Sequence, residues 1–394
     1  MPANDRAKTP TYAESGVDEE LEQTVFRRAM LPWLRQTAVR SPLVSEITGL
    51  ASGYFATLLR LPPGPPLALT TDGVGTKILL ASQRDDQDGY RCIGVDVIAN
   101  NVNDIICVGA TPIALLDYLA TDRIDESILA QIAEGIYLGA TEAGIAVPGG
   151  EIAQVGAMLA ATDSGAPMLD LVGTALGAMP KGDGPDGWRE PLDGSETRAG
   201  DLIIGLPSSG LHSNGYSLAR EVVRRAALDL NAPVNSFGVA GTDDARPLGQ
   251  ALLEPTRIYV NAVESLFESG VRPHGLVHIS GGGLLNLTRL AADVSYTLDS
   301  LHPDDQPPPL FGLLQAAGEL PSNTMYETLN MGIGFCVTVA PADLERALTA
   351  LAGDDGDPAS APRVIGTVTD QPGRMVTIPS ASLTGAGDTF TVTS

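Results

Sequence analysis

Hydrophobic positions between residues 12 and 179 follow two different periods. Three short apolar runs have the length and composition of β-strands: Leu67–Thr71, Arg91–Val95 and Ile113–Tyr118. Two longer stretches, residues 97–109 and 126–144, repeat their apolar positions every three to four residues, which predicts helices with one buried face. Strands and helices therefore mix in this part of the chain.

The same mixture returns after residue 200. The predicted strands there are Asp201–Leu206, Gly275–Ile279, Met331–Val339 and Val364–Val368. The predicted helices are Ser213–Leu230, Pro255–Ser269 and a segment around Asp343–Ala352, with Ser213 or Asn214 as the N-cap of the first. Residues 180–200 are rich in glycine, proline and charge, which suits a domain boundary or a surface insertion.

We therefore expect an α+β protein with two domains, each containing a sheet and helices. The N-terminal domain is predicted at residues 12–179 and the C-terminal domain at residues 201–378, with a linker or insertion at 180–200. Residues 1–11 are polar and contain proline, so we expect a flexible arm there. Residues 379–394 carry no strong pattern, and we expect a mobile tail.

Composition excludes several classes of protein. Asp and Glu total 48 against 24 Lys and Arg, which leaves a formal charge of −24 on 394 residues. Such a surface repels phosphate backbones and anionic lipids, so neither nucleic acid nor a membrane surface is an expected partner. The chain contains no run of about 20 apolar residues, the length that a helix needs to span a bilayer. Three scattered cysteines in apolar runs predict buried thiols, and with no apolar leader at the start we expect a cytoplasmic protein.

The segment Thr70–Lys77 follows a predicted strand and contains two glycines, Gly73 and Gly75. Glycines let backbone N–H groups approach and surround an anion. Asp72 is a candidate ligand for a hard metal ion and Lys77 a candidate phosphate ligand. Lys77 is one of only three lysines in the chain. A tight turn that needs glycine for its geometry explains the same residues about equally well.

A narrow polar stripe lies on the predicted helix that follows. Asp96, Asn100, Asn103 and Asp104 fall on one side of it, and apolar residues cover the remaining faces. Carboxylate and amide oxygens are ligands for magnesium (Mg²⁺), so we favour a metal site. An N-cap at Asp96 with a polar interface is the alternative. Glu151, after two glycines, is a further candidate metal ligand or acid–base group.

Two more loops combine glycine with histidine. Ser213 and Asn214 precede a predicted helix, where hydroxyl and N–H groups can bind an anion, and His212 beside them could donate to phosphate or carry a proton. His278 leads into Gly281–Gly283, a second possible phosphate cradle. An N-capping loop with a satisfied histidine, and a structural turn with a core histidine, are the alternatives.

Nine segments that occur in order along the chain together resemble one family: Tyr12–Asp18, Thr71–Lys77, Gly94–Asp96 with Asn103–Asp104, Leu116–Thr121, Gly149–Glu151, Pro207–Ser217, Leu253–Tyr259, His278–Gly283 and Asn330–Gly334. That family is phosphoribosylformylglycinamidine cyclo-ligase, also called aminoimidazole ribonucleotide synthetase. The resemblance implies an ATP-dependent ring closure in purine biosynthesis. ATP would phosphorylate the formamide oxygen of formylglycinamidine ribonucleotide, the amidine nitrogen would attack, and ADP and phosphate would leave.

The resemblance also implies a homodimer, in which the N-terminal mixed sheets form a barrel across two subunits and the C-terminal domain is an α/β sandwich. Catalytic roles would fall to Asp96, Lys77, His212 and His278. Magnesium would be held by Asp72, Asp96, Asp104 and Glu151. ATP and its phosphates would be bound by Asp72, Gly73, Gly75, Thr76, Lys77, Ser213, Asn214, Gly281, Gly282 and Gly283.

The chain departs from the family pattern at residues 152–156, where a hydroxyl and a carboxylate are missing, and at residues 52–55. Two alternatives therefore stand beside the cyclo-ligase. One is a relative of the same fold that uses ATP on another acceptor, such as selenophosphate synthetase or thiamine-phosphate kinase. The other is a paralogue that binds nucleotide without turnover.

Overall fold

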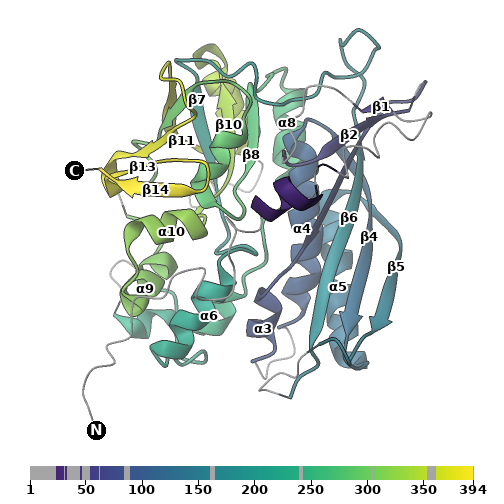
Figure 1. Cartoon of the computed structure of the whole chain (residues 1–394), viewed down its shortest axis with the longest axis vertical. Coiled ribbons are helices and arrows are strands. Elements are labelled where there is room, and N and C mark those ends of the chain that lie inside the picture. The colour runs from purple at the N-terminus through teal and green to yellow at the C-terminus, as the bar shows by residue number, and fades with distance from the viewer. Residues whose placement is uncertain are drawn as a thin grey trace.

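The computed structural model describes residues 24–30, 32, 45–46, 54–61, 63–83, 89–159, 165–238, 243–302, 306–352 and 361–393. Two mixed sheets, each with its own helices, lie side by side, and helix α4 (Arg91–Cys107) runs between them (Figure 1). The predicted flexible arm, residues 1–11, lies outside the described residues. No helix within the described ranges is both long and apolar enough to cross a membrane.

The N-terminal sheet has six strands in the order β1-β2-β3-β6-β4-β5. Its strands are β1 (Ser45–Glu46), β2 (Thr57–Arg60), β3 (Pro66–Gly73), β4 (Thr111–Thr121), β5 (Ala146–Gln154) and β6 (Leu169–Ala178). Strands β4 and β5 pair in parallel through the crossover helix α5 (Glu126–Ala143), and the other pairs are antiparallel. Helices α4 and α5 cover one face of the sheet, and the short helix α3 (Lys77–Ala81) follows β3.

The strand predicted at residues 91–95 is wrong, because these residues form the first turns of α4. A short apolar run has the same hydrophobic pattern in a buried helix and in a buried strand, so the pattern does not distinguish them. Gly94 allows this helix to lie directly against α5: a Cβ at Gly94 would come within 2.1 Å of the Ile132 carbonyl oxygen. The close contact between two helix backbones depends on that glycine and on Gly135 opposite.

The C-terminal sheet has eight strands in the order β14-β13-β12-β9-β11-β7-β10-β8. They are β7 (Leu202–Pro207), β8 (Gly275–His278), β9 (Ser295–Thr297), β10 (Ile333–Val339), β11 (Arg363–Thr369), β12 (Val376–Ile378), β13 (Leu383–Ala386) and β14 (Thr389–Val392). The helices are α6 (Tyr216–Arg225), α7 (Leu248–Leu252), α8 (Val260–Glu268), α9 (Pro309–Gly318), α10 (Ser322–Thr328) and α11 (Leu344–Leu351). Short non-α helical turns lie at Phe26–Met30, Val234–Phe237, Gly283–Arg289, Pro341–Asp343 and Pro379–Ala381.

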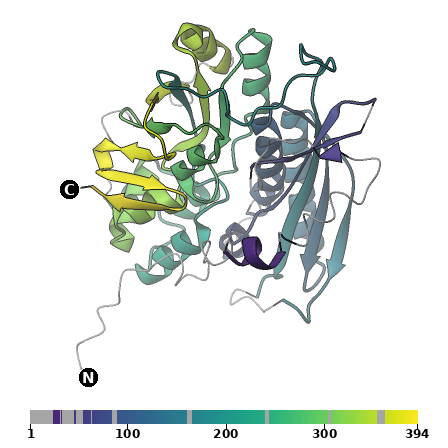
Figure 2. The same ribbon diagram turned by 45° about the horizontal axis from the view of Figure 1, so that its top comes forward.

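The predicted tail at residues 379–394 is also wrong over its described part. Strands β13 and β14 form a hairpin that extends the eight-stranded sheet, and Figures 1 and 2 both place it on the side remote from the N-terminal sheet. Leu383 and Phe390 are buried, and the Phe390 N–H donates to the Glu327 carboxylate at 2.6 Å. Two short strands with alternating buried residues leave too brief a pattern to stand out in the sequence.

Two predicted helices begin later than expected. Helix α6 starts at Tyr216, with Gly215 as N-cap at φ 74°, so neither Ser213 nor Asn214 is the N-cap. Helix α8 starts at Val260, because residues before it bond to side chains of α4 instead of forming a helix. Thr256, Arg257 and Tyr259 thereby join the two units.

The segment 180–200 connects the units without a helix or a named strand of its own. It packs against the end of α4: the Leu192 N–H donates to the Val108 carbonyl at 3.1 Å, and the Arg189 guanidinium donates to the Gly109 carbonyl at 3.1 Å. Leu192 is buried. The three cysteines are buried, as the sequence indicates.

Candidate active site

Asp96, the first residue of the polar stripe on α4, forms a buried ion pair with Lys77. The Lys77 ammonium lies 2.8 Å from Asp96 Oδ2, and neither side chain is exposed to solvent. The ammonium also donates to the carbonyls of His212 at 2.9 Å and Glu254 at 2.8 Å. Burial opposes the charge, but the Asp96 carboxylate outweighs it, so the pKa of Lys77 is raised.

This ion pair corrects two expectations for the site. Asp96 Oδ1 accepts both the Lys77 ammonium at 3.0 Å and the Thr256 N–H at 2.7 Å, while Oδ2 has only the ion-pair contact with the same ammonium and no hydrogen bond among the described residues. All three ammonium protons of Lys77 are likewise used within the protein. The structure therefore places Asp96 and Lys77 against each other, rather than against a metal ion and a phosphate.

Two asparagines of α4 also bind backbone. Asn103 donates to the Arg257 carbonyl at 2.9 Å and accepts the Tyr259 N–H at 3.0 Å. Its neighbour Asn101 accepts the Asp72 N–H at 3.0 Å and donates to the Asp72 carbonyl at 3.1 Å. The polar-interface alternative thus explains a large part of the polar surface of this helix, because these side chains act as partners for strand and loop backbone.

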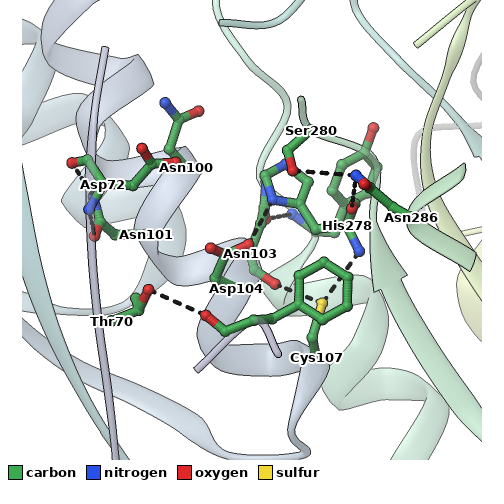
Figure 3. A network of polar contacts seen from close by, with 12 residues as sticks. Thr70, Asp72, Asn100, Asn101, Asn103, Asp104, Cys107, His278, Ser280 and Asn286 are labelled. Atoms are coloured by element: carbon green, nitrogen blue, oxygen red, sulfur yellow. Dashed lines mark hydrogen bonds and ion pairs between the residues drawn. The ribbon is translucent and has the colours of Figure 1, made fainter. Parts of the chain in front are cut away.

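The second half of the stripe is different, and Figure 3 shows it at close range. Asp104 of α4 and Asp72 at the end of β3 are both half-buried. Asp104 Oδ1 lies 2.9 Å from His278 Nδ1, so the imidazole of β8 and the carboxylate of α4 point toward one another. Burial, together with the negative charge of Asp104, raises the pKa of Asp72 to about 6. A bound cation would favour the ionised form of both carboxylates.

Two buried polar atoms near these carboxylates have no partner among the described residues: Asn100 Oδ1 and His278 Nε2. The Asn100 amide is oriented by its donation to the Gly73 carbonyl at 3.1 Å, which leaves Oδ1 as an available acceptor. His278 is held through its carbonyl by Asn286, whose amide also donates to Ser280 Oγ, both at 3.2 Å. Buried polar groups are rarely left unpaired, so these atoms indicate a ligand or water site.

Glu151 does not join this cluster. In the register of the N-terminal sheet, Asp72 pairs with Gly173, which pairs with Asp117, which pairs with Gly150. Side chains alternate between the faces of a strand, so Glu151 lies on the opposite face from Asp72. It is exposed there. In the described part of the chain, no group of three or more His, Cys, Asp or Glu side chains could hold a metal ion, so the expected set of four ligands is wrong as a set.

His212 lies inside the C-terminal unit rather than at an open site. It is 1% exposed, and its ring Nε2 accepts the Ser209 N–H at 3.3 Å. Burial, helped by the charges of His278 and Lys77, lowers its pKa well below the ordinary value. The ring packs beneath β10 so closely that a Cβ on Gly334 would lie 2.3 Å from it. The imidazole is therefore a neutral core group, but it is only partly satisfied, because its Nδ1 is buried without a partner among the described residues.

The candidate phosphate-binding residues divide by accessibility. Gly75 is exposed at φ 69° with no neighbour for a Cβ, and Gly73, Asn214, Gly281 and Gly282 are half-buried. The hydroxyls of Thr76 and Ser213 are engaged across segments, with Ser217 at 3.1 Å and Thr256 at 3.0 Å respectively. Gly283 is buried and opens a helical turn. Two N–H-bearing loops thus remain open to a ligand, one from each unit.

Asn286 and Arg289 were not recognised from the sequence. Arg289 lies over the Phe55 ring at 5.2 Å, and its positive charge opposes the rise in the pKa of Asp72. Both residues belong to the turn after the Gly281–Gly283 loop. Their position just beyond a glycine loop was the one available signal, and it does not distinguish them from other polar residues there.

The two units, with polar residues of both along the helix between them, define a class of two-domain protein. The family model "AIR synthase related protein, N-terminal domain" matches residues 53–179, and the model "AIR synthase related protein, C-terminal domain" matches residues 198–378. Together they cover most of the chain. The molecule is therefore an AIR synthase related protein with both domains.

Curated relatives identify the particular family. The chain is 40% identical to the phosphoribosylformylglycinamidine cyclo-ligase of Methanothermobacter thermautotrophicus, over 92% of this chain and 95% of that one. It is 42% identical to the enzyme of the same name from Methanocaldococcus jannaschii, over 91% and 92% of the two chains. The chain belongs to the phosphoribosylformylglycinamidine cyclo-ligase family, whose members are C–N-bond-forming ligases.

Solved structures share the fold at lower identity. The hydrogenase maturation protein HypE in complex with ATP superposes with a TM-score of 0.54 and 18% sequence identity, covering 91% of this chain and 90% of that one. This likeness extends to the arrangement of both units.

Proposed function

We propose that this chain converts formylglycinamidine ribonucleotide to aminoimidazole ribonucleotide, with ATP as the phosphoryl donor. The formamide oxygen receives the γ-phosphoryl group and becomes a leaving group. The amidine nitrogen then attacks the same carbon, the carbon–oxygen bond breaks, and the nitrogen loses a proton. The products are the imidazole ring, ADP and phosphate. The observation that carries the proposal is the set of polar groups at the junction of the two units: the Asp104–His278 pair, Asp72, whose pKa burial and Asp104 raise, and the unpartnered Asn100 oxygen and His278 nitrogen.

The acidic pair fits magnesium held partly by a nucleotide. Mg²⁺ commonly takes one or two protein carboxylates and completes its shell with phosphate oxygens and water. Asp72 and Asp104 would provide the carboxylates and Asn100 Oδ1 a further oxygen. Burial and then the negative charge of Asp104 raise the pKa of Asp72, and a bound divalent cation would favour the ionised carboxylate against both. When bound, magnesium and ATP supply the phosphoryl group that activates the amide oxygen. The complex of HypE with ATP supports nucleotide binding by this fold.

His278 is placed to accept the proton that the amidine nitrogen loses. Its Nδ1 faces the Asp104 carboxylate at 2.9 Å, an acceptor, so the proton of the neutral ring belongs on Nδ1 and the Nε2 lone pair is available. Asp104 would also stabilise the imidazolium that forms. A general base oriented by a carboxylate is a recurrent arrangement in enzymes.

One face of the N-terminal sheet, left uncovered by the described residues, supports a homodimer. Helices cover the other face, while Leu116 and Tyr118 of β4 are 52% and 45% exposed on this one. Their register partners on β6, Thr174 and Val172, lie on the same face. An exposed apolar sheet face of this kind is typical of a protein–protein interface. We propose that two copies pack through this face. The proposed place of the reaction is the cytoplasm.

The test is turnover with the named substrate. Purified protein with Mg²⁺, ATP and formylglycinamidine ribonucleotide should release ADP and aminoimidazole ribonucleotide in equal amounts. Asp72→Asn and Asp104→Asn should each lower kcat/KM by at least about 100-fold, because each removes a negative charge from the cation site. Glu268→Gln, an exposed carboxylate on α8, is the matched control and should keep full activity.

Each failure has a separate meaning. ADP release without the imidazole product would mean that the enzyme phosphorylates a different acceptor. ATP binding without ADP release would favour a non-catalytic paralogue. Full activity in Asp104→Asn would overturn the placement of the site.

A further inference from the structure

Lys77 joins its own segment to three others at the boundary between the two units. It begins α3, its partner Asp96 lies on α4, and its other two acceptors are carbonyls of the C-terminal unit. We infer that Lys77 is a positioning residue, whose ammonium fixes the loop between β7 and α6 against the nucleotide-binding side of α4. The inference deepens the proposed function and rests on it for its catalytic consequence.

The geometry excludes a direct phosphate contact in this arrangement. The ammonium is completely buried, and its three donors are directed to Asp96, to the His212 carbonyl and to the Glu254 carbonyl within 2.8–3.0 Å. The Tyr216 ring lies on a further side, 5.5 Å from the nitrogen. A phosphate oxygen could reach Lys77 only if one of these contacts were broken. The glycine loop before it, by contrast, is open at Gly75.

The loop that Lys77 holds is strained at the contact itself. His212 adopts φ 61°, a left-handed conformation that costs a non-glycine residue free energy unless the surroundings compensate. Its carbonyl is the group that accepts from Lys77. The next two residues, Ser213 and Asn214, are the loop residues expected to bind nucleotide. An interaction that stabilises the His212 conformation therefore sets where those two residues lie.

Two of the contacts between the C-terminal unit and α4 lie at the two ends of the polar stripe. Near the start of the helix, Asp96 receives Lys77 and the Thr256 N–H. Eight residues later, about 12 Å along the axis, Asp104 receives His278. The proposed cation site lies at the second contact, beside Asp104. At the first contact, the Lys77 and Asp96 side chains are not accessible to a ligand. Loosening the first contact should change how the nucleotide loop meets the site, without removing any group that touches substrate.

Buried ion pairs respond to mutation in a recognisable way. Removing one partner leaves an uncompensated charge and is strongly destabilising, whereas neutralising both partners together is often tolerated. Lys77→Met should therefore destabilise the fold more than the double variant Lys77→Met/Asp96→Asn does. In the double variant, the side-chain amide oxygen introduced at position 96 can still accept the Thr256 N–H. A residue that touches phosphate would behave differently, because changing Asp96 cannot restore a lost phosphate contact.

The experiment compares these variants with wild type and with Lys181→Met, a matched control at the exposed lysine beside Trp188. In the ligand-free protein, amide hydrogen exchange in residues 208–215 and 254–256 should accelerate in Lys77→Met and slow again in the double variant. Lys77→Met should lose about 100-fold in kcat/KM, and the double variant should recover at least about tenfold. Lys181→Met should match wild type in both measurements.

Unchanged exchange in Lys77→Met, or a loss of ATP affinity that the second substitution does not relieve, would overturn the inference in favour of direct phosphate binding. If Lys77→Met does not fold, rescue is measured as recovery of thermal stability in the double variant. Exchange in the ligand-free protein does not depend on turnover. A wild-type protein that lacks cyclo-ligase activity would therefore refute the proposed function and leave the test of Lys77 intact.

Discussion

His302 is a buried imidazole whose charge depends on the folded state. It is 6% exposed, and neither ring nitrogen has a partner among the described residues. Burial, with the positive charge of Arg363, lowers its pKa from 6.5 to about 4. Between those two values the unfolded chain binds the proton and the folded chain does not. The stability contributed by the neutral ring is therefore present above pH 6.5 and is lost as the pH falls from 6.5 toward 4.

We expect His302→Leu to reduce the acid sensitivity of the fold. Wild type should lose about 1 kcal/mol through this one group when the pH falls from 7.5 to 5.5, and the variant should not. Urea unfolding at both pH values measures the difference. Since the pKa of His212 is lowered as well, some slope will remain in the variant. An identical slope in wild type and His302→Leu would contradict the prediction.

Asp96 and Asp104 show why single residues on one helix face can differ in role. Both belong to the same polar stripe, yet Asp96 is completely buried against Lys77, while the Asp104 side chain beside His278 keeps 16% exposure. The stripe itself was evident from the spacing of polar residues. The difference between its ends was not, because it depends on partners that are distant in sequence and meet α4 only in the folded chain.

At the scale of secondary structure, the C-terminal hairpin should contribute to stability as a unit. Phe390 is 4% exposed, and its N–H is bonded to Glu327 of α10. Phe390→Ala should lower the free energy of unfolding by about 3–4 kcal/mol, because it leaves a cavity beneath β14. Val392 lies in the same strand and is 70% exposed. Val392→Ala is therefore the control, and it should change stability by no more than about 0.5 kcal/mol in a urea titration. Equal effects of the two substitutions would mean that the hairpin is not packed as described.

Most regular elements were predictable because their patterns are long. The strand at 67–71 and the helix at 126–144 occur almost as expected, as β3 and α5. The failures are physical in origin. A five-residue apolar run at 91–95 contains no period that separates strand from helix, and the choice was made by contact with α5. The later start of α8 was likewise imposed by Asp96 and Asn103.

At the scale of the whole molecule, helices cover one face of the N-terminal sheet, and no helix of the described residues covers the other. That second face presents Leu116 and Tyr118 near the centre of β4. Placing a charge there should prevent two copies from packing. We expect wild type to sediment as a dimer and Leu116→Glu as a monomer. Tyr137, 68% exposed on α5, lies away from this face, and Tyr137→Glu is the control that should stay dimeric.

The charge of the chain adds a condition to this association. Each copy carries a formal charge of −24, so two copies repel each other over the distance at which their charges are unscreened. The Debye length falls from about 10 Å at 0.1 M salt to about 3 Å at 1 M. The dimer dissociation constant should therefore decrease as salt is raised, which sedimentation at several salt concentrations measures. An interface held mainly by ion pairs would weaken instead. A wild-type protein that stays monomeric at micromolar concentration in high salt would contradict the apolar interface altogether.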